Sequence, residues 1–239
     1  GEVILSKDYR SWGSFFYDPA RDQMRAKIQL RNIAHTELLT YDFINLNKNG
    51  GELVLNWEKK QFPVSIEFAV DEIVMANAEQ ELKGALGFNW QGPSSAATYA
   101  MQNKISLDKA AVWIDQAIAQ NKSYATLNTK AALLRQSGKT AEADKIQADA
   151  TAIATEAELN QYGYQLINDN RMDEAIKVMV LMTDRHPQSA NAWDSLGEAY
   201  ALKGDKANAI KSFKKSLSLN PPEATKLNSE KYLKQLGGM

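Results

Sequence analysis

Few residues in this sequence have a type and spacing that could support catalysis. Glu52, Glu58 and Glu67 fall on polar positions of alternating segments, where two of them could face each other as an acid and a base. The two histidines, His35 and His186, are far apart in the sequence, and neither has a second ligand or base at a suitable spacing. The simpler interpretation is that the glutamates and His35 are solvated, and that His186 caps a helix C-terminus.

The sequence contains no established motif for catalysis or metal binding. We find no Gly-x-Ser-x-Gly turn, no phosphate-binding glycine loop, no His-Glu-x-x-His pair and no calcium loop. The absence of cysteine from the sequence excludes disulfides, thiolate zinc sites and thiol catalysis. We therefore expect no enzymatic activity, no bound metal and no cofactor.

An aromatic cluster near the start of the chain could bind a ligand. Trp12, Phe15, Phe16 and Tyr17 offer rings that could stack on a sugar. Such residues more often form a hydrophobic core, so carbohydrate or small-ligand binding by the N-terminal part is the alternative function. A weaker third hypothesis is a hydrolase fragment or accessory domain whose active part precedes Gly1.

Composition narrows the classes of partner. The 28 basic and 29 acidic residues give a net charge of −1 and form no basic block, so we expect no nucleic-acid partner. No apolar run reaches the roughly 18 residues of a membrane span. With 44% hydrophobic and 24% charged residues, the sequence is typical of a folded globular protein.

The first 70 residues alternate between apolar and polar side chains with a period of two, as half-buried strands do. Asn49-Gly50-Gly51 supplies residues that favour a hairpin turn, and the polar residues 59–61 form a short link. This part therefore predicts an antiparallel β domain over residues 1–70. The alternating segments are 24–31, 39–43, 53–58 and 64–70, and two further strands are expected near 2–6 and 14–17.

Beyond residue 70 the pattern changes to helical. Asp71 is a suitable N-cap, and glycines interrupt the stretch before residue 91, which predicts a connecting helix and loop over 71–90. Residues 91–239 then show apolar side chains at helical spacing. We expect four helical hairpins, at 91–123, 124–155, 156–189 and 190–223, followed by a capping helix at 224–236.

The strongest pattern is a 34-residue repeat near the end of the chain. Gly163 and Gly197, Ala175 and Ala209, and Pro187 and Pro221 are each 34 residues apart. A fixed period of this length is typical of stacked helical hairpins with an open concave face. The last unit matches the tetratricopeptide pattern at Trp193, Leu196, Gly197, Tyr200, Ala209, Phe213 and Pro221, so residues 91–239 resemble that repeat family.

The N-terminal part has a separate resemblance, carried by Val3–Lys7, Trp12-Gly13, Tyr17-Asp18 and Leu53–Glu58. These residues resemble the second half of the exported bacterial domain-of-unknown-function family twenty-nine-eleven, whose members often carry tetratricopeptide repeats. The resemblance implies an exported, periplasmic location and an incomplete β domain. A homodimer through an exposed sheet edge is then a further expectation. The family brings no catalytic residues.

Together these patterns predict an α+β protein that acts as a non-enzymatic protein–protein interaction scaffold. In such repeats the first helix of each hairpin lines the concave face, where a peptide or protein segment would bind. Relatives that hold the acidic C-termini of chaperones use lysines and an arginine there, and this sequence offers only an arginine, so that ligand is not expected. The predicted partner-binding residues are Asn128, Arg135, Asn160, Tyr164, Asn168, Asn191, Asp194 and Glu198.

Overall fold

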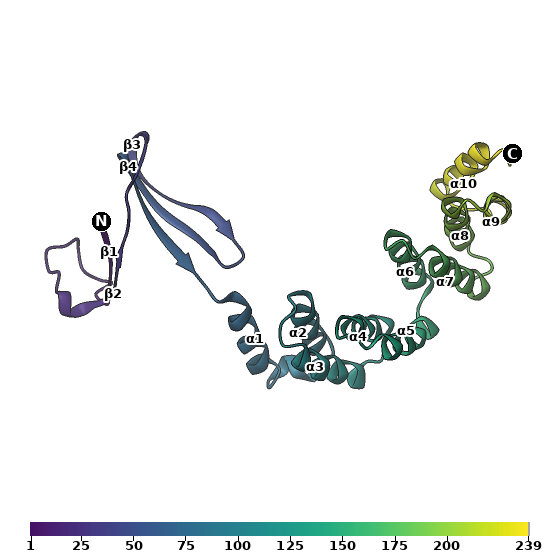
Figure 1. The fold of residues 1–239 in the computed structure, drawn as a ribbon, viewed down its shortest axis with the longest axis horizontal. Helices are drawn as coiled ribbons and strands as arrows, with labels where there is room; N and C mark the ends of the chain where they lie inside the picture. The colour runs from purple at the N-terminus through teal and green to yellow at the C-terminus, as the bar shows by residue number, and fades with distance from the viewer. Residues whose placement is uncertain (239) are drawn as a thin grey trace. The chain divides into compact units, whose positions relative to one another are not determined.

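The computed structural model describes residues 1–238 and has an α+β fold, with antiparallel strands followed by a series of helices (Figure 1). The chain divides into two compact units, Gly1–Ala78 and Glu79–Met239. The first unit holds the strands, and the second holds the helical hairpins.

The strands form two antiparallel pairs. Strand β1 (Glu2–Ser6) pairs with β2 (Asp22–Lys27), and β3 (Arg31–Asn47) pairs with β4 (Gly50–Glu67). The hairpin between β3 and β4 closes where Asn47 pairs with Gly50, at the turn that the sequence predicts. Segment 14–17 is wrongly predicted as a strand, because the structure has turns there, just after Gly13 with φ of +63°.

Strand β4 turns back along its length. The sequence predicts two strands joined at 59–61, whereas the structure has one continuous strand element over this region. The amide of Phe68, just beyond β4, nevertheless donates to the carbonyl of Asn49, just before it, at 2.7 Å. A straight strand rises roughly 3.3 Å per residue, so these ends could meet only if the strand reverses direction. Glu58, with φ of +52°, lies near the middle of β4.

The strand-containing unit buries few of its apolar side chains. Val54 is fully buried, whereas Trp57, which alternation predicts to be in the core, is 52% exposed. Trp12, Phe15 and Phe16 are also exposed. The physical reason is that paired strands bury an apolar face only when a second layer packs against it.

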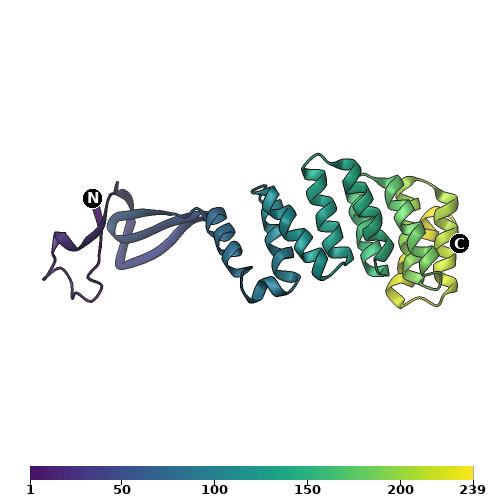
Figure 2. The ribbon, with the colours of Figure 1, turned by 90° about the horizontal axis from the view of Figure 1, so that it is seen from below.

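The second unit is helical, and its hairpins follow one another in the sequence (Figure 2). Helix α1 (Val70–Glu81) and the 3₁₀ turn η2 (Ala85–Phe88) precede the hairpins. Serine and threonine caps fix where later helices begin, since Ser123 and Thr155 each close a capping box on the third residue of α4 and α6. The remaining helices are α2 (Gln91–Gln102), α3 (Leu107–Gln120), α4 (Tyr124–Gln136), α5 (Thr140–Ile153), α6 (Glu156–Asn168), α7 (Met172–Arg185), α8 (Ala190–Lys203), α9 (Lys206–Ser218) and α10 (Glu223–Leu236).

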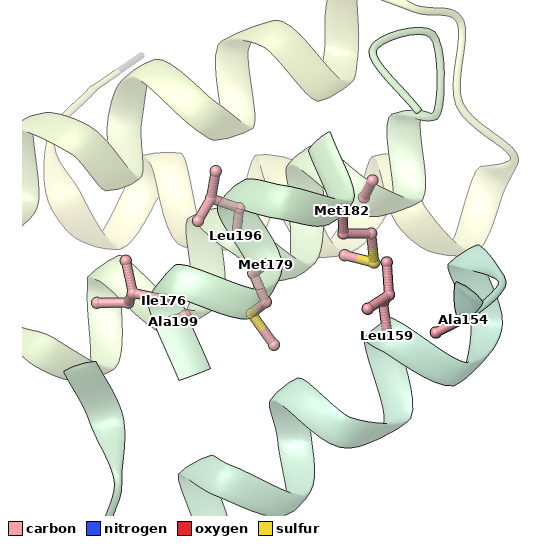
Figure 3. Close-up of a cluster of buried hydrophobic side chains, with 8 residues drawn as sticks. Ala154, Leu159, Ile176, Met179, Met182, Leu196 and Ala199 are labelled. Carbon is pink, nitrogen blue, oxygen red and sulfur yellow. The ribbon is translucent and has the colours of Figure 1, made fainter. Parts of the chain in front are cut away.

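Small residues allow the two helices of a hairpin to pack closely. A Cβ at Gly163 would lie 2.7 Å from the end of Met179, and a Cβ at Gly197 would lie 2.8 Å from the ring of Phe213. Larger side chains then fill the space between consecutive hairpins, where Leu159, Met179, Met182 and Leu196 form a buried cluster between α6, α7 and α8 (Figure 3). The fourth residue of the second helix of each hairpin is a fully buried alanine: Ala110, Ala143, Ala175 and Ala209.

Helix α10 packs on the last hairpin. The ring of Tyr232 stacks on Phe213 with centroids 5.0 Å apart, and Leu233 is buried beside them. This arrangement covers apolar surface that α8 and α9 would otherwise expose. Helix α10 therefore caps the last hairpin of the described chain.

Candidate binding surface

The eight residues predicted to contact a partner lie on α4, α6 and α8, the first helices of three consecutive hairpins. Figure 1 shows the helical unit as a curved row, with α6 and α8 on the inner side of the curve and α7 and α9 on its outer side. Asn160 and Tyr164 come from α6, and Asp194 and Glu198 from α8. The side chains of these residues differ in whether their polar atoms already make hydrogen bonds within the protein.

A hydrogen-bond network joins α6, α8 and α10. The hydroxyl of Tyr164 donates to Glu198 Oε2 at 2.5 Å. The side-chain amide of Asn228 donates to Asp194 Oδ2 at 2.8 Å and to Glu198 Oε1 at 2.7 Å. The hydroxyl of Ser229 donates to Asp194 Oδ1 at 2.5 Å. Three of the predicted binding residues, Tyr164, Asp194 and Glu198, are therefore engaged inside the protein.

Burial sets the protonation behaviour of this network. Burial raises the pKa of Asp194, and the nearby Glu198 raises it further, while hydrogen bonds from Ser229 and Asn228 oppose the shift. Burial and the hydrogen bond to Glu198 also raise the pKa of Tyr164, which keeps its hydroxyl protonated as a donor. The network is consistent with a structural contact between α8 and α10.

Asn160 differs from its neighbours because its Oδ1 atom is buried and has no hydrogen-bond partner among residues 1–238. Asn160 occupies the same place in α6 that Asp194 occupies in α8 and Asn228 in α10, since these residues are 34 positions apart. Asn128, which is half-buried, holds the corresponding place in α4. Helices α4, α6, α8 and α10 thus each carry one amide or carboxylate at this position.

The other predicted residues divide between solvent and the neighbouring helix. Asn168 and Asn191 are exposed. Arg135 instead contacts α5, because its guanidinium donates to Gln147 Oε1 at 3.3 Å and to Asp144 Oδ1 at 3.2 Å. Arg135 is therefore bound to the second helix of its own hairpin.

Sequence reasoning missed the roles of Asn228 and Ser229, because residues 224–236 were interpreted only as an apolar cap. Ser229 is fully buried and Asn228 bridges two carboxylates. The 34-residue spacing from Asp194 to Asn228 was the signal that could have identified them. Asn228, which lies 34 residues after Asp194, thus contacts the preceding first helix α8 from the capping helix α10.

The family comparisons agree with the repeat in the last hairpin. The family model described as tetratricopeptide repeat matches residues 190–223, which contain α8 and α9. A second model, for proteins of unknown function (DUF2911), matches residues 1–66, which contain all four strands except the last residue of β4. No curated protein sequence matches the chain.

Several solved tetratricopeptide and related structures are similar to the chain. YrrB, described as a TPR protein with an unusual peptide-binding site, is 18% identical, with 67% of this chain and 83% of that chain covered and a TM-score of 0.40. PilF of Pseudomonas aeruginosa is 20% identical, with 61% and 68% covered and a TM-score of 0.38. MamA of Desulfovibrio magneticus RS-1 is 14% identical, with 60% and 93% covered and a TM-score of 0.35.

Two of the three predicted carboxylates, Glu52 and Glu58, lie next to basic side chains. Glu52 receives two hydrogen bonds of 2.7 Å from Arg31, which lowers the pKa of that carboxyl. The Oε2 atom of Glu58 lies 3.2 Å from Nε2 of His35, which belongs to strand β3. Within the described part of the chain, no group of three or more histidine, cysteine, aspartate or glutamate side chains could hold a metal ion.

The DUF2911 segment contains an apolar cavity of about 300 Å³. The aromatic cluster lies elsewhere, and within it the rings of Trp12 and Phe15 stack with centroids 6.2 Å apart. The cavity is lined by Gly1, Glu2, Val3, Ile28, Tyr41, Leu53, Leu55, Phe62 and Val64.

Among residues 1–238, no helix is long and apolar enough to cross a membrane.

Proposed function

We propose that the inner face of α4 and α6 binds an extended peptide segment of a partner protein. The tetratricopeptide repeat makes the helical unit a protein-interaction scaffold. The observation that supports the finer proposal is the buried, unpartnered Oδ1 of Asn160. A buried acceptor without a hydrogen bond costs about 1–3 kcal/mol, so a donor supplied by a ligand would be favourable there.

An extended backbone offers such a donor. Asn128 and Asn160 stand on adjacent first helices, and an asparagine amide can both accept from a peptide N–H and donate to a peptide carbonyl. Such contacts bind the main chain, which makes them tolerant of the ligand's sequence. We infer that these two residues hold the backbone of the peptide.

The network with α10 limits the extent of this surface. Asp194 and Glu198 are already hydrogen-bonded to Asn228, and a ligand would have to break these bonds to use them. Of the three predicted binding residues on α8, Asn191, near its start, is the exposed one. We therefore place the centre of the binding surface on α6, with Asn168 and Asn191 at its border.

The test is a pull-down with the double variant Asn128→Ala, Asn160→Ala. We expect it to lose a protein that the wild type retains, because both main-chain contacts are removed. Gln165→Ala is the matched control, since Gln165 is an exposed amide on another side of α6. An unchanged set of captured proteins, with both variants folded by circular dichroism, would contradict the proposal.

The cavity in the DUF2911 segment supports a second candidate, a small apolar ligand. Its walls are formed mainly by aliphatic and aromatic side chains such as Val3, Leu55 and Phe62. An apolar lining favours a hydrophobic molecule over a carbohydrate. Thermal-shift measurements against panels of apolar compounds and glycans test both, and the absence of any shift would remove this candidate.

The strand pairs also support a homodimer. Strand β3 pairs only with β4 among the described strands, so its other edge could accept a strand from a second copy. Light scattering after size exclusion tests this, and a monomer mass at every concentration would contradict it. We further propose an exported, periplasmic location, which cell fractionation of the full gene product would test.

A further inference from the structure

A groove runs between the second and third hairpins. It is bounded by the second helices α5 and α7, with Arg135 of α4 and Tyr162 and Leu166 of α6 also lining it. Its volume is about 250 Å³, and it is open to solvent. The α6 residues of the inner face, Asn160 and Tyr164, are not among those that line it.

The groove contains a residue that breaks the packing pattern of the array. The fourth residue of the second helix of each hairpin is a buried alanine, and the residue four positions after it has a large side chain in the core. In three hairpins this side chain is apolar and fully buried, whereas in the second it is glutamine, also 95% buried. The four residues are Ile114, Gln147, Met179 and Phe213.

Gln147 is not fully satisfied within the protein. Its Oε1 accepts from Arg135, which fixes the orientation of the amide, and its Nε2 is buried without a partner among residues 1–238. An apolar residue would avoid the cost of this unmade hydrogen bond. Positions where a sequence breaks its own packing rule are expected to be functional or strained.

Other donors in the groove also lack acceptors. The Tyr162 hydroxyl makes no hydrogen bond within the described structure, and burial raises its pKa, so it stays protonated. The two acidic groups are each held by an arginine: Asp144 by Arg135, and Glu174 by Arg171. Lys177 makes no such ion pair within the described range, although its charge helps to lower the pKa of Asp173 and of Glu174. The groove groups without a hydrogen-bonded acceptor are therefore two neutral donors and one ammonium group.

We propose that this groove binds an acidic side chain of a partner protein, next to a large apolar residue. The carboxylate accepts from Gln147 Nε2 and the Tyr162 hydroxyl and pairs with Lys177. The apolar neighbour packs on Leu166 and Val178. Because the groove is open, the bound chain can continue past it on both sides, which favours an internal glutamate or aspartate over a chain terminus.

The test uses a capped octapeptide, acetyl-Gly-Ser-Gly-Glu-Leu-Gly-Ser-Gly-amide, followed by the methyl NMR signals of Leu166 and Val178. We expect saturable shifts, and at least a tenfold weaker affinity when the glutamate of the peptide is replaced by glutamine. No shifts with the glutamate peptide, or equal shifts with the glutamine peptide, would overturn the proposal. Tighter binding of a peptide that ends in a free leucine carboxylate would overturn the choice of an internal acidic residue.

The decisive variant is Gln147→Met, which places in the second hairpin the residue that Met179 provides in the third. It should raise the urea midpoint of unfolding and reduce affinity for the glutamate peptide at least fivefold. A purely structural role for Gln147 predicts a stability change with unchanged binding. Lys177→Gln should also weaken binding, whereas Lys145→Gln, an exposed control on α5, should not.

This site is independent of the inner face. Gln147→Met should leave capture of the inner-face partner unchanged, and the Asn128→Ala, Asn160→Ala variant should bind the glutamate peptide normally. Loss of both activities in either variant would indicate a general folding defect, and it would count against two separate sites.

Discussion

Gly163 and Gly197 occupy the same place in consecutive hairpins, but the structure predicts opposite tolerance to alanine. A Cβ at Gly197 would lie 2.8 Å from both Cδ1 and Cε1 of Phe213, and 3.0 Å from Cγ. The Phe213 ring is fully buried and stacked on Tyr232, so it has little room to move. A Cβ at Gly163 would instead lie 2.7 Å from Cε and 3.0 Å from Cγ of Met179, which is also fully buried but is an unbranched, flexible side chain.

The magnitudes follow from two opposing terms. Overpacking a core costs about 1–3 kcal/mol, and we place Gly197→Ala near the top of that range and Gly163→Ala near the bottom. Replacing glycine by alanine inside a helix also stabilises the folded state by about 1 kcal/mol in both cases, because alanine has the higher helix propensity. The free energy of unfolding should therefore fall by about 2 kcal/mol for Gly197→Ala and change by about 0 kcal/mol for Gly163→Ala.

Urea unfolding followed by circular dichroism measures these differences. Because repeat arrays can unfold in parts, hydrogen exchange of α8 and α9 is needed to localise the effect. Gly197→Ala should speed exchange in these two helices. If Gly163→Ala is destabilised as much as Gly197→Ala, the argument from side-chain flexibility is refuted.

Three further predictions concern the last hairpin and α10. Phe213→Ala should lower the free energy of unfolding by about 3–5 kcal/mol, because it removes a fully buried ring; a loss below about 1 kcal/mol in urea unfolding would contradict this. Asn228→Ala leaves two carboxylates without their shared donor and should weaken α10 docking by about 1–3 kcal/mol, seen as faster hydrogen exchange in α10, with exposed Asn191→Ala as a neutral control. The pKa of Asp194 is raised in the folded state, so the folded protein binds its proton more tightly than the unfolded chain does. Protonation of Asp194 therefore stabilises the fold. This contribution is fully present below the ordinary pKa of 3.8 and is lost as pH rises through the folded-state pKa. Wild type should therefore gain stability relative to Asp194→Asn as pH is lowered from about 7 to about 4, and a constant difference across this range would refute the assignment.

The helical part of the fold was predictable because its constraints are local and periodic. Small residues such as Gly197 and Ala209 occur where two helices cross closely, and these positions repeat along the chain. Trp193 and Phe213 then identify the hairpin as a tetratricopeptide repeat, which the family comparison confirms. The α+β class followed from the change of period near residue 70.

The strand region was harder to predict because alternation shows which side chains share a face but not what covers that face. Trp57 has the flanking pattern of a core residue and is still half-exposed, since no element among residues 1–238 covers it fully. The segment around Phe15 contains strand-forming residues but adopts turns. In both cases the deciding factor is tertiary and not visible in local spacing.

The sequence could predict which helix positions belong to the candidate site, but not which of their polar atoms are free to bind a partner. The sequence places Asn160 and Asp194 at equivalent positions, but it does not show that Asp194 is bonded to α10 while Asn160 Oδ1 has no partner. That difference depends on Asn228, which belongs to a helix outside the repeats. The Gln147 position was visible as a departure from Ile114, Met179 and Phe213, yet its significance required the structure.

The docking of α10 has a consequence for self-assembly. Helical arrays with a bare apolar flank can stack end to end, and a head-to-tail contact that does not close into a ring grows into a filament. Here Tyr232 and Leu233 occupy that flank, and Asn228 and Ser229 hold the helix in place from the side. Polymerisation from the α9 end is therefore blocked for as long as α10 stays docked.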